Sequence, residues 1–164
     1  MCTLSFIPRR QGYLVAMNRD ERLTRVEALP PRSLRFAGTA AIYPHEPRGG
    51  TWIAVNDRGI TLALLNLGDS SGPRRRSRGE IIPALVGSAS LAEAGARMKG
   101  EALAGVLPFR LIGIFGRERR IVEWRWDGGD LRRRSFSWRR RHWFSSGISD
   151  ERARRHRQLV FEAA

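Results

Sequence analysis

The only cysteine of this 164-residue chain is Cys2, which directly follows the initiator Met1. If Met1 is removed, as a small second residue permits, Cys2 carries both a thiol and a free α-amine. These groups ordinarily titrate near ~8.5 and ~7.7–8.0, so the amine can act as the general base for its own side chain. Position 2 therefore offers the chemistry of an N-terminal nucleophile.

A second group of reactive side chains lies in the stretch NRDE, residues 18–21. A nearby arginine lowers the pKa of a thiol, and a carboxylate can hold an ammonium group. The same residues also have a purely structural interpretation. A small cysteine packs well inside a protein, and Asn and Asp side chains commonly make turn hydrogen bonds.

The elements that would bring these two stretches together are two apolar runs, 2–7 and 13–19, which flank the turn-like PRRQG and predict a β-hairpin. With the turn centred on Arg10, Cys2 would lie opposite Asn18, and Asp20 would share its face. A shift of the register by one residue would place Arg19 there instead. Either register puts the polar cluster beside the start of the chain.

The rest of the pattern predicts one α+β domain over residues 1–164. Strand-like runs come first, helical periods follow, strands return, and a helix closes the chain. We expect a loop at 22–35, a turn at YPHEPRGG (43–50), a hairpin of TWIAV and ITLALLN, and helices at 80–87 and 90–98, with Ser90 as the N-cap of the second. Later strands are predicted in FRLIGIFG, RIVEWRW, LRRRSFSW and HWFSS, and the final helix at 150–163.

Composition limits the cellular setting and the kinds of cofactor. No apolar run is long enough for a membrane span, and no secretory signal opens the chain. A single cysteine makes no internal disulfide, which favours the cytoplasm. The three histidines (His45, His142 and His156) lack metal-ligand spacing, so we expect no metal site.

The formal net charge is +14 and comes almost entirely from arginine, because Lys99 is the only lysine. Such a charge attracts polyanions, including nucleic acids. Generic phosphate binding would use both basic residues, so the scarcity of lysine favours a compositional bias over a nucleic-acid partner.

Three motifs together resemble a known family. MCTLSF, NRDE and GGTW (49–52), the last ahead of a hairpin that ends in Asn66, resemble the NRDE family, whose eukaryotic member is the transport and Golgi organization protein two. That family is in turn similar to N-terminal nucleophile (Ntn) hydrolases such as bile salt hydrolases and penicillin V acylases. The resemblance implies a four-layer αββα sandwich of two antiparallel sheets, here shortened at its C-terminal end. The missing strands would leave a sheet edge open, which favours a homodimer.

The resemblance also implies roles for individual residues. Cys2 would be the nucleophile, Asp20 would position its amine, and the backbone N–H near Asn66 would join an oxyanion hole. Arg19 stands close to the position of a hydrolase arginine. Ser145 or Ser146 would replace an amide donor to the oxyanion, and Arg154 would supply a distal arginine. The remaining motif residues expected in the ligand site are Asn18, Gly50 and Trp52.

Three functions remain open at this stage. The first is hydrolysis of a small-molecule, non-peptide amide by Cys2. The second is a non-catalytic carrier of haem or a lipid-like ligand, with haem as cargo and no resident cofactor. The third is polyanion binding through the arginines.

Overall fold

The computed structural model describes residues 2–21, 24–36, 38–47, 49–68, 76–145 and Phe161. Within them the strands form two antiparallel sheets, one of three strands in the order β10-β1-β2 and one of seven in the order β3 to β9. The three-stranded sheet consists of β1 (Cys2–Pro8), β2 (Tyr13–Arg19) and β10 (Arg141–Ser145). The seven-stranded sheet consists of β3 (Leu29–Phe36), β4 (Thr39–His45), β5 (Ile53–Asn56), β6 (Ile60–Asn66), β7 (Phe109–Phe115), β8 (Arg120–Trp126) and β9 (Leu131–Phe136).

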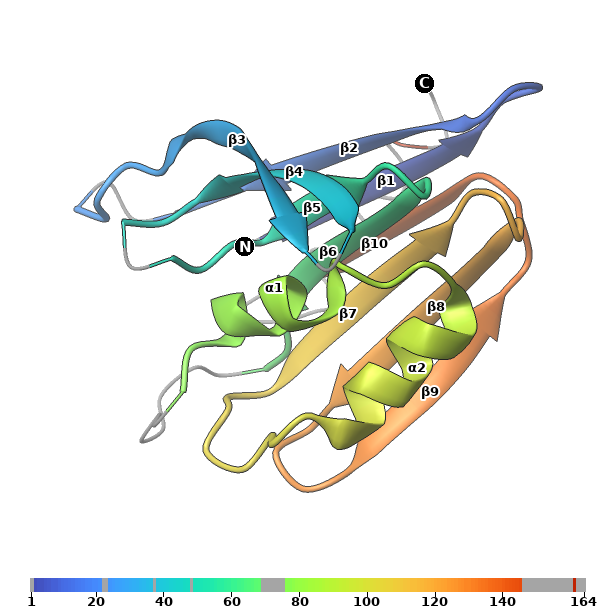
Figure 1. Ribbon diagram of the computed structural model, residues 1–164. Coiled ribbons are helices and arrows are strands. Elements are labelled where there is room, and N and C mark those ends of the chain that lie inside the picture. Colours follow the sequence, from blue (N-terminus) through green and yellow to red (C-terminus); the bar gives the residue numbers. More distant parts are fainter. Residues whose placement is uncertain are drawn as a thin grey trace.

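The helices lie between β6 and β7 in the chain, as expected from the change of period. They are η1 (Arg78–Glu80), α1 (Ile81–Leu85) and α2 (Leu91–Gly100). The Ser90 side chain accepts a hydrogen bond from the Glu93 backbone N–H at 3.1 Å, so the predicted N-cap is confirmed. Both α-helices cover one face of the seven-stranded sheet (Figure 1).

The three-stranded sheet packs on the other face of the seven-stranded sheet. Leu4 and Phe6 of β1 are fully buried against Leu65, Ile112 and Ile114. Strands β6 and β7 are therefore covered on both faces, which explains why they are nearly continuous apolar runs rather than alternating ones. The α+β class and the two antiparallel sheets of the predicted sandwich are confirmed.

Two sequence-based predictions are wrong at the start of the large sheet. Residues 29–36 form β3 rather than part of a loop, and β4 extends into the predicted turn as far as His45. Among the described residues, strand β3 pairs only with β4. An edge strand tolerates Pro30 and Pro31 because their missing N–H groups are not needed by a second described neighbour. After β4, the Gly49 N–H donates to the Glu46 carbonyl at 2.8 Å, as expected of a turn.

The first hairpin forms as predicted, but its register differs by one residue from the turn centred on Arg10. The loop has four residues, closed by a 3.1 Å hydrogen bond from the Arg9 N–H to the Gly12 carbonyl, with Gly12 at a φ of 81°. Cys2 consequently pairs with Arg19 and not with Asn18. The alternative register considered from the sequence is the one that the protein adopts.

The predicted final helix at 150–163 lies outside the described residues except for Phe161. The Phe161 ring stacks on His142 of β10 with 4.7 Å between the ring centroids.

Candidate active site around Cys2

Cys2 occupies the middle of a row of three residues across the small sheet. Strand β1 lies between β10 and β2, and Cys2 is paired with Ser145 on one side and Arg19 on the other. Its backbone N–H donates to the Ser145 Oγ at 3.1 Å. We call this row, Ser145–Cys2–Arg19, the floor of the site, because Cys2 and Arg19 border a cavity.

The Cys2 thiol is buried, with the residue only 6% exposed. Burial raises the pKa of this thiol, while the charge at the amino terminus, Arg19 and a hydrogen bond with Ser145 act to lower it. Both neighbours in the floor thus favour the thiolate against the cost of burial. Burial is the largest of these effects and Glu21 acts in the same direction, so the pKa of the thiol lies above its ordinary value.

The cavity has a volume of about 90 Å³ and opens beside Cys2. Residues from well-separated parts of the chain surround it, and most of them are polar or charged. The lining consists of Cys2, Arg19, Glu21, Arg25, Glu46, Thr51, Trp52, Leu64, Asn66, Arg76, Ser77, Arg78, Gly79 and Leu107.

One side of the cavity is a network of paired charges, which we call the glutamate wall: Arg19, Glu21, Arg25 and Glu46. The Arg19 Nη2 lies 2.5 Å from the Glu21 Oε1 and 3.5 Å from the Glu46 Oε1. The Arg19 Cζ lies 3.8 Å from the centre of the Trp52 ring. Arg25 pairs with both carboxylates. The two arginines and two glutamates neutralise one another and fix the Arg19 guanidinium beside Cys2.

The pKa of the Glu21 carboxyl reflects this pairing. Burial acts to raise its pKa, but the hydrogen bonds and charges of Arg25 and Arg19 outweigh burial and lower the pKa below its usual range.

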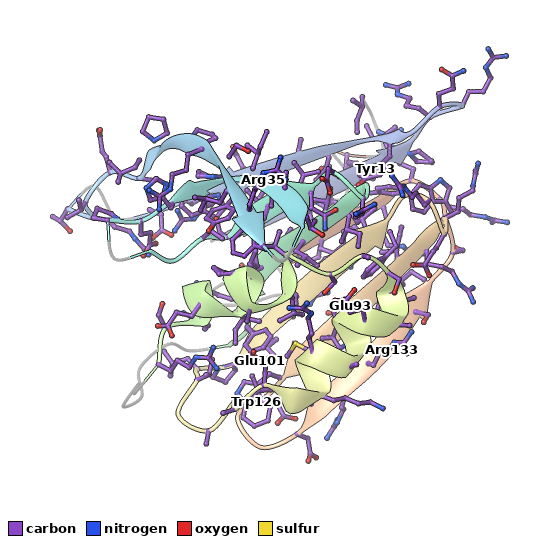
Figure 2. The ribbon with its side chains drawn as sticks, in the orientation of Figure 1. Tyr13, Arg35, Glu93, Glu101, Trp126 and Arg133 are labelled. Atoms are coloured by element: carbon purple, nitrogen blue, oxygen red, sulfur yellow. The ribbon has the colours of Figure 1, made fainter. Side chains whose placement is uncertain are left out.

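The opposite side, which we call the arginine wall, is the segment Arg76 to Gly79. Its backbone is set by a capping box, in which the Ser77 hydroxyl accepts from the Gly79 N–H and the Glu80 carboxylate accepts from the Ser77 N–H. Arg76 pairs with Glu101 at 2.8 Å and with Glu80 at 3.2 Å; Glu101 directly follows α2 (Figure 2). The Arg78 Nη1 donates to the Pro108 carbonyl at 3.0 Å.

The arginine wall meets the turn after Glu46 where Gly79 touches Gly50, whose carbonyl accepts a hydrogen bond from the Glu46 N–H. The Thr51 N–H donates to the Gly79 carbonyl at 3.0 Å, and a Cβ added at Gly79 would come within 3.0 Å of the Gly50 Cα. Gly50 is buried, and a Cβ added there would lie 3.3 Å from the Gly79 Cα, so the two backbones approach closely at this point.

An ion pair beneath the floor ties the two sheets together. Arg110 of β7 is bound to the buried Glu123 of β8, and its Nη1 donates to the Phe144 carbonyl of β10 at 3.2 Å. Phe144 directly precedes Ser145, so this contact holds the strand that supplies the partner of the Cys2 amide.

The structure brings several of the predicted site residues together. Cys2, Arg19, Trp52 and Asn66 all line the cavity, and Ser145 contacts Cys2. The register places Asn18 opposite Thr3, on the other face of β2 from Arg19, and Asn18 and Asp20 are both exposed and outside the cavity lining. The roles expected of Asn18 and Asp20 remain predictions, and Ser146 and Arg154 lie outside the described residues.

Sequence reasoning missed most of the charged lining. Arg25, Glu46, Arg76 and Arg78 were not singled out, although the spacing of Ser77 and Glu80 is that of a capping box and marks an ordered segment at the end of a polar loop. That spacing was the available signal for the arginine wall.

Comparison with known sequences now places the chain. A sequence model of the family described as "Transport and Golgi organisation 2" matches residues 1–124, well over half of the protein. The chain belongs to this family. The match includes Cys2 and both walls of the cavity, and it ends before β9 and β10, so Ser145 lies beyond it. A search of curated protein sequences found no significant match.

Similar folds occur among solved structures of Ntn hydrolases. Penicillin V acylase from Agrobacterium tumefaciens aligns with a TM-score of 0.58 and 12% identity over 98% of this chain and 57% of its own. A cysteine-to-alanine variant of conjugated bile acid hydrolase from Clostridium perfringens gives the same score and identity, over 98% and 58%. The likeness establishes the fold, and the chain spans somewhat more than half the length of these enzymes.

Two kinds of feature are absent from the described residues. These residues contain no helix long and apolar enough to cross a membrane. They also contain no group of three or more His, Cys, Asp or Glu side chains suited to a metal ion.

Proposed function

We propose that this member of the family hydrolyses a C–N bond of a small, non-peptide amide, with Cys2 as the nucleophile once Met1 has been removed. The observation that carries the proposal is the floor of the cavity, where Cys2 stands between Arg19 and a serine that accepts a hydrogen bond from its backbone nitrogen. The names of the structural neighbours, an acylase and a hydrolase, support the same reaction class.

The chemistry follows from the position of the Cys2 nitrogen. After Met1 is removed this nitrogen is an amine, and it takes the thiol proton while the sulfur attacks the carbonyl carbon and forms a C–S bond. Arg19, which favours the thiolate, assists this step. The ammonium then returns its proton to the leaving nitrogen as the C–N bond breaks. Water cleaves the resulting thioester, which releases a carboxylic acid and restores the thiol.

Two further groups assist the reaction, one by stabilising charge and one by orienting the amine. The backbone N–H near Asn66, at the end of β6, donates to the oxyanion of the tetrahedral intermediate. Ser145 accepts a hydrogen bond from the Cys2 nitrogen and so orients the amine that moves the proton.

The size of the cavity favours this function over a carrier of haem or a lipid-like ligand. Pockets for drug-sized ligands typically enclose ~300–1,000 Å³. A cavity of about 90 Å³ lined mainly by polar and charged residues fits the reacting end of a small substrate better than a macrocycle.

The test begins with the intact mass of the purified protein, which we expect to lack Met1. The protein is then incubated with a panel of small N-acyl amides, and amine release is followed with Cys2→Ala and Cys2→Ser as paired variants. We expect turnover and an acyl adduct on Cys2 in the unmodified protein, and a loss of about 10³-fold or more in both variants. Retention of Met1, or turnover by Cys2→Ala, would overturn the proposal.

A further inference from the structure

We infer that one face of the antiparallel pair β8–β9 docks an acidic, extended segment of a partner protein. Three exposed arginines, Arg125, Arg132 and Arg134, lie on this face, and we call them the basic face. None of the three lines the cavity at Cys2, so the inference goes beyond the proposed function and does not depend on it.

The register of the large sheet places the three arginines side by side. Arg125 of β8 pairs directly with Arg132 of β9, and Arg134 follows two residues later on the same side of the strand. This side faces the small sheet, because Phe136, two residues further on, packs against the core between the two sheets. The small sheet does not bury the arginines, since all three are exposed.

The basic face keeps a positive charge after its ion pairs are counted. Glu123 is the only carboxylate on this face of β7, β8 and β9, and it is buried. It lies opposite Arg134 in the register but is bound to Arg110 instead. Among the described residues, neither Arg125 nor Arg134 forms an ion pair or a side-chain hydrogen bond.

Arg132 is the one member of the basic face with carboxylates in reach. Its Nη2 lies 3.5 Å from the Asp130 carboxylate and 3.7 Å from that of Asp127, both near the turn between the strands. The side chains of Arg132 and Asp130 are 72% and 75% exposed, and pairs so exposed contribute little because water and salt screen them. All three guanidinium groups are therefore accessible to an acidic ligand.

Protection of a sheet edge does not account for these charges. Edge strands often carry basic side chains that discourage pairing with another chain. That explanation suits β9, which has one described neighbour in the sheet. It does not suit Arg125, because β8 is paired on both sides, with β7 and with β9.

The make-up of the basic face favours a protein partner over a nucleic acid. It holds arginine and no lysine, and protein interfaces are enriched in arginine and depleted in lysine. Single-stranded nucleic acids bind where bases can stack on aromatic rings. The only aromatic ring on this face of β7, β8 and β9 is that of Phe136, and it already packs with Arg134 at 5.0 Å and Arg141 at 4.5 Å.

The spacing of the arginines fits an extended segment. Side chains two residues apart in a strand lie on one side, roughly 6.6–6.8 Å from each other, and Arg132 and Arg134 have this relation. A segment with an acidic residue at every second position repeats the same distance. A guanidinium has five donors in a planar fork that matches a carboxylate, so each arginine can hold one acidic side chain.

The test measures the binding of a fluorescein-labelled peptide in which Glu and Thr alternate, by fluorescence anisotropy. The ionic strength is held at ~0.15 M, where the Debye length is ~8 Å and distant charges contribute little. We expect the double variant Arg125→Gln/Arg134→Gln to raise the Kd of this peptide about 3–10-fold. A peptide with Gln in place of Glu should bind the unmodified protein more weakly, and equal binding of the two peptides would overturn the inference.

The matched control is Arg120→Gln/Arg133→Gln. It removes the same charge from exposed positions on the same two strands, but on the opposite face, the one covered by the helices (Figure 2). Its Kd should stay within about a factor of two of the unmodified protein. An equal rise in both double variants would assign binding to the overall +14 charge, and an unchanged Kd in Arg125→Gln/Arg134→Gln would place it elsewhere; either result overturns the inference.

A second measurement needs no variant. Amide hydrogen exchange of the unmodified protein should slow in β9 when the acidic peptide is added and should not change in α2, and the opposite pattern would contradict the inference. Oligothymidylate of equal charge is the competing ligand. If it binds the basic face more tightly than the peptide does, the partner is a nucleic acid and the inference is wrong. No amide turnover enters these measurements, so their outcome is distinct from that of the proposed function.

Discussion

The two walls of the cavity use arginine in different ways. In the glutamate wall, the carboxylates that pair with Arg19 and Arg25 also line the cavity, so the charges cancel where a ligand would meet them. In the arginine wall, the carboxylates that pair with Arg76 lie outside the lining, and one hydrogen bond of Arg78 goes to the Pro108 carbonyl. The same type of side chain therefore acts on the thiol on one side and, on the other, ties the segment 76–79 to residues that follow α2.

We expect the largest effect on turnover from a change in the floor of the site. Ser145→Ala removes the acceptor of the Cys2 N–H and should lower amide turnover by about 10–100-fold, because a misplaced reacting group costs on the order of 10² in rate. It should also raise the pKa of the Cys2 thiol, so the alkylation rate would rise at higher pH than in the unmodified protein.

Ser135→Ala, at an exposed serine of β9, is the control for Ser145→Ala and should change neither quantity. Normal turnover with an unshifted alkylation profile in Ser145→Ala would show that the floor does not depend on this hydrogen bond.

The contact of Gly79, in the arginine wall, with Gly50 provides the next prediction. Gly79→Ala forces a methyl group against the Gly50 backbone and should lower the free energy of unfolding by about 1–3 kcal/mol, measured by urea titration. Gly95→Ala, within α2 where an added Cβ meets nothing within 4 Å, should raise that free energy by roughly 0.5–1 kcal/mol. Equal effects at the two glycines would contradict the close contact.

A third prediction separates the walls by their effect on the thiol. Arg19→Gln should slow alkylation of Cys2 by neutral iodoacetamide about 2–5-fold at pH 8, because the pKa of the thiol rises when this positive charge is lost. Arg78→Gln should leave that rate unchanged, because Arg19 and not Arg78 is among the charges that act on the pKa of the thiol. If both variants slow iodoacetamide equally, the division of labour between the walls is wrong.

The smallest effect concerns the pH dependence of stability. Pairing lowers the pKa of Glu21 in the folded state, so it contributes stability above the pKa of the unfolded chain, and this contribution is lost as the pH falls through the lower folded value. The side chain is partly exposed, and about 0.2–1 kcal/mol is expected. Glu21→Gln should thus lower the unfolding free energy at pH 7 but not at pH 2, whereas Glu27→Gln, at an exposed position, should do neither.

Much of the fold could be predicted from local sequence signals. Strands β6 and β7 are long apolar runs, and α2 begins at a recognisable N-cap. Strand β3 was missed because its two prolines are typical of loops, and only its place at the edge of the sheet makes them acceptable.

The residues that make up the site could be predicted from the sequence better than their arrangement in space. The three motifs identified Cys2, Arg19, Trp52 and Asn66, which do surround one cavity. Arg19, and not Asn18, faces Cys2 because the hairpin loop holds an even number of residues. The sequence PRRQG is compatible with an odd or an even number, so it does not decide the register. The capping box of Ser77 and Glu80 is a local signal for the arginine wall, but its contact with Gly50 through Gly79 is tertiary, and no local pattern predicts it.

The pairing of β1 with β10 has a consequence for the timing of synthesis. Cys2 and Ser145 are 143 residues apart, so the first reactive group to leave the ribosome meets its hydrogen-bond partner only when most of the chain has been made. At a translation rate of roughly 5–20 residues per second, that interval lasts several seconds to half a minute. If Met1 is removed in this interval, the reaction takes place on an accessible chain end, before β10 pairs with β1.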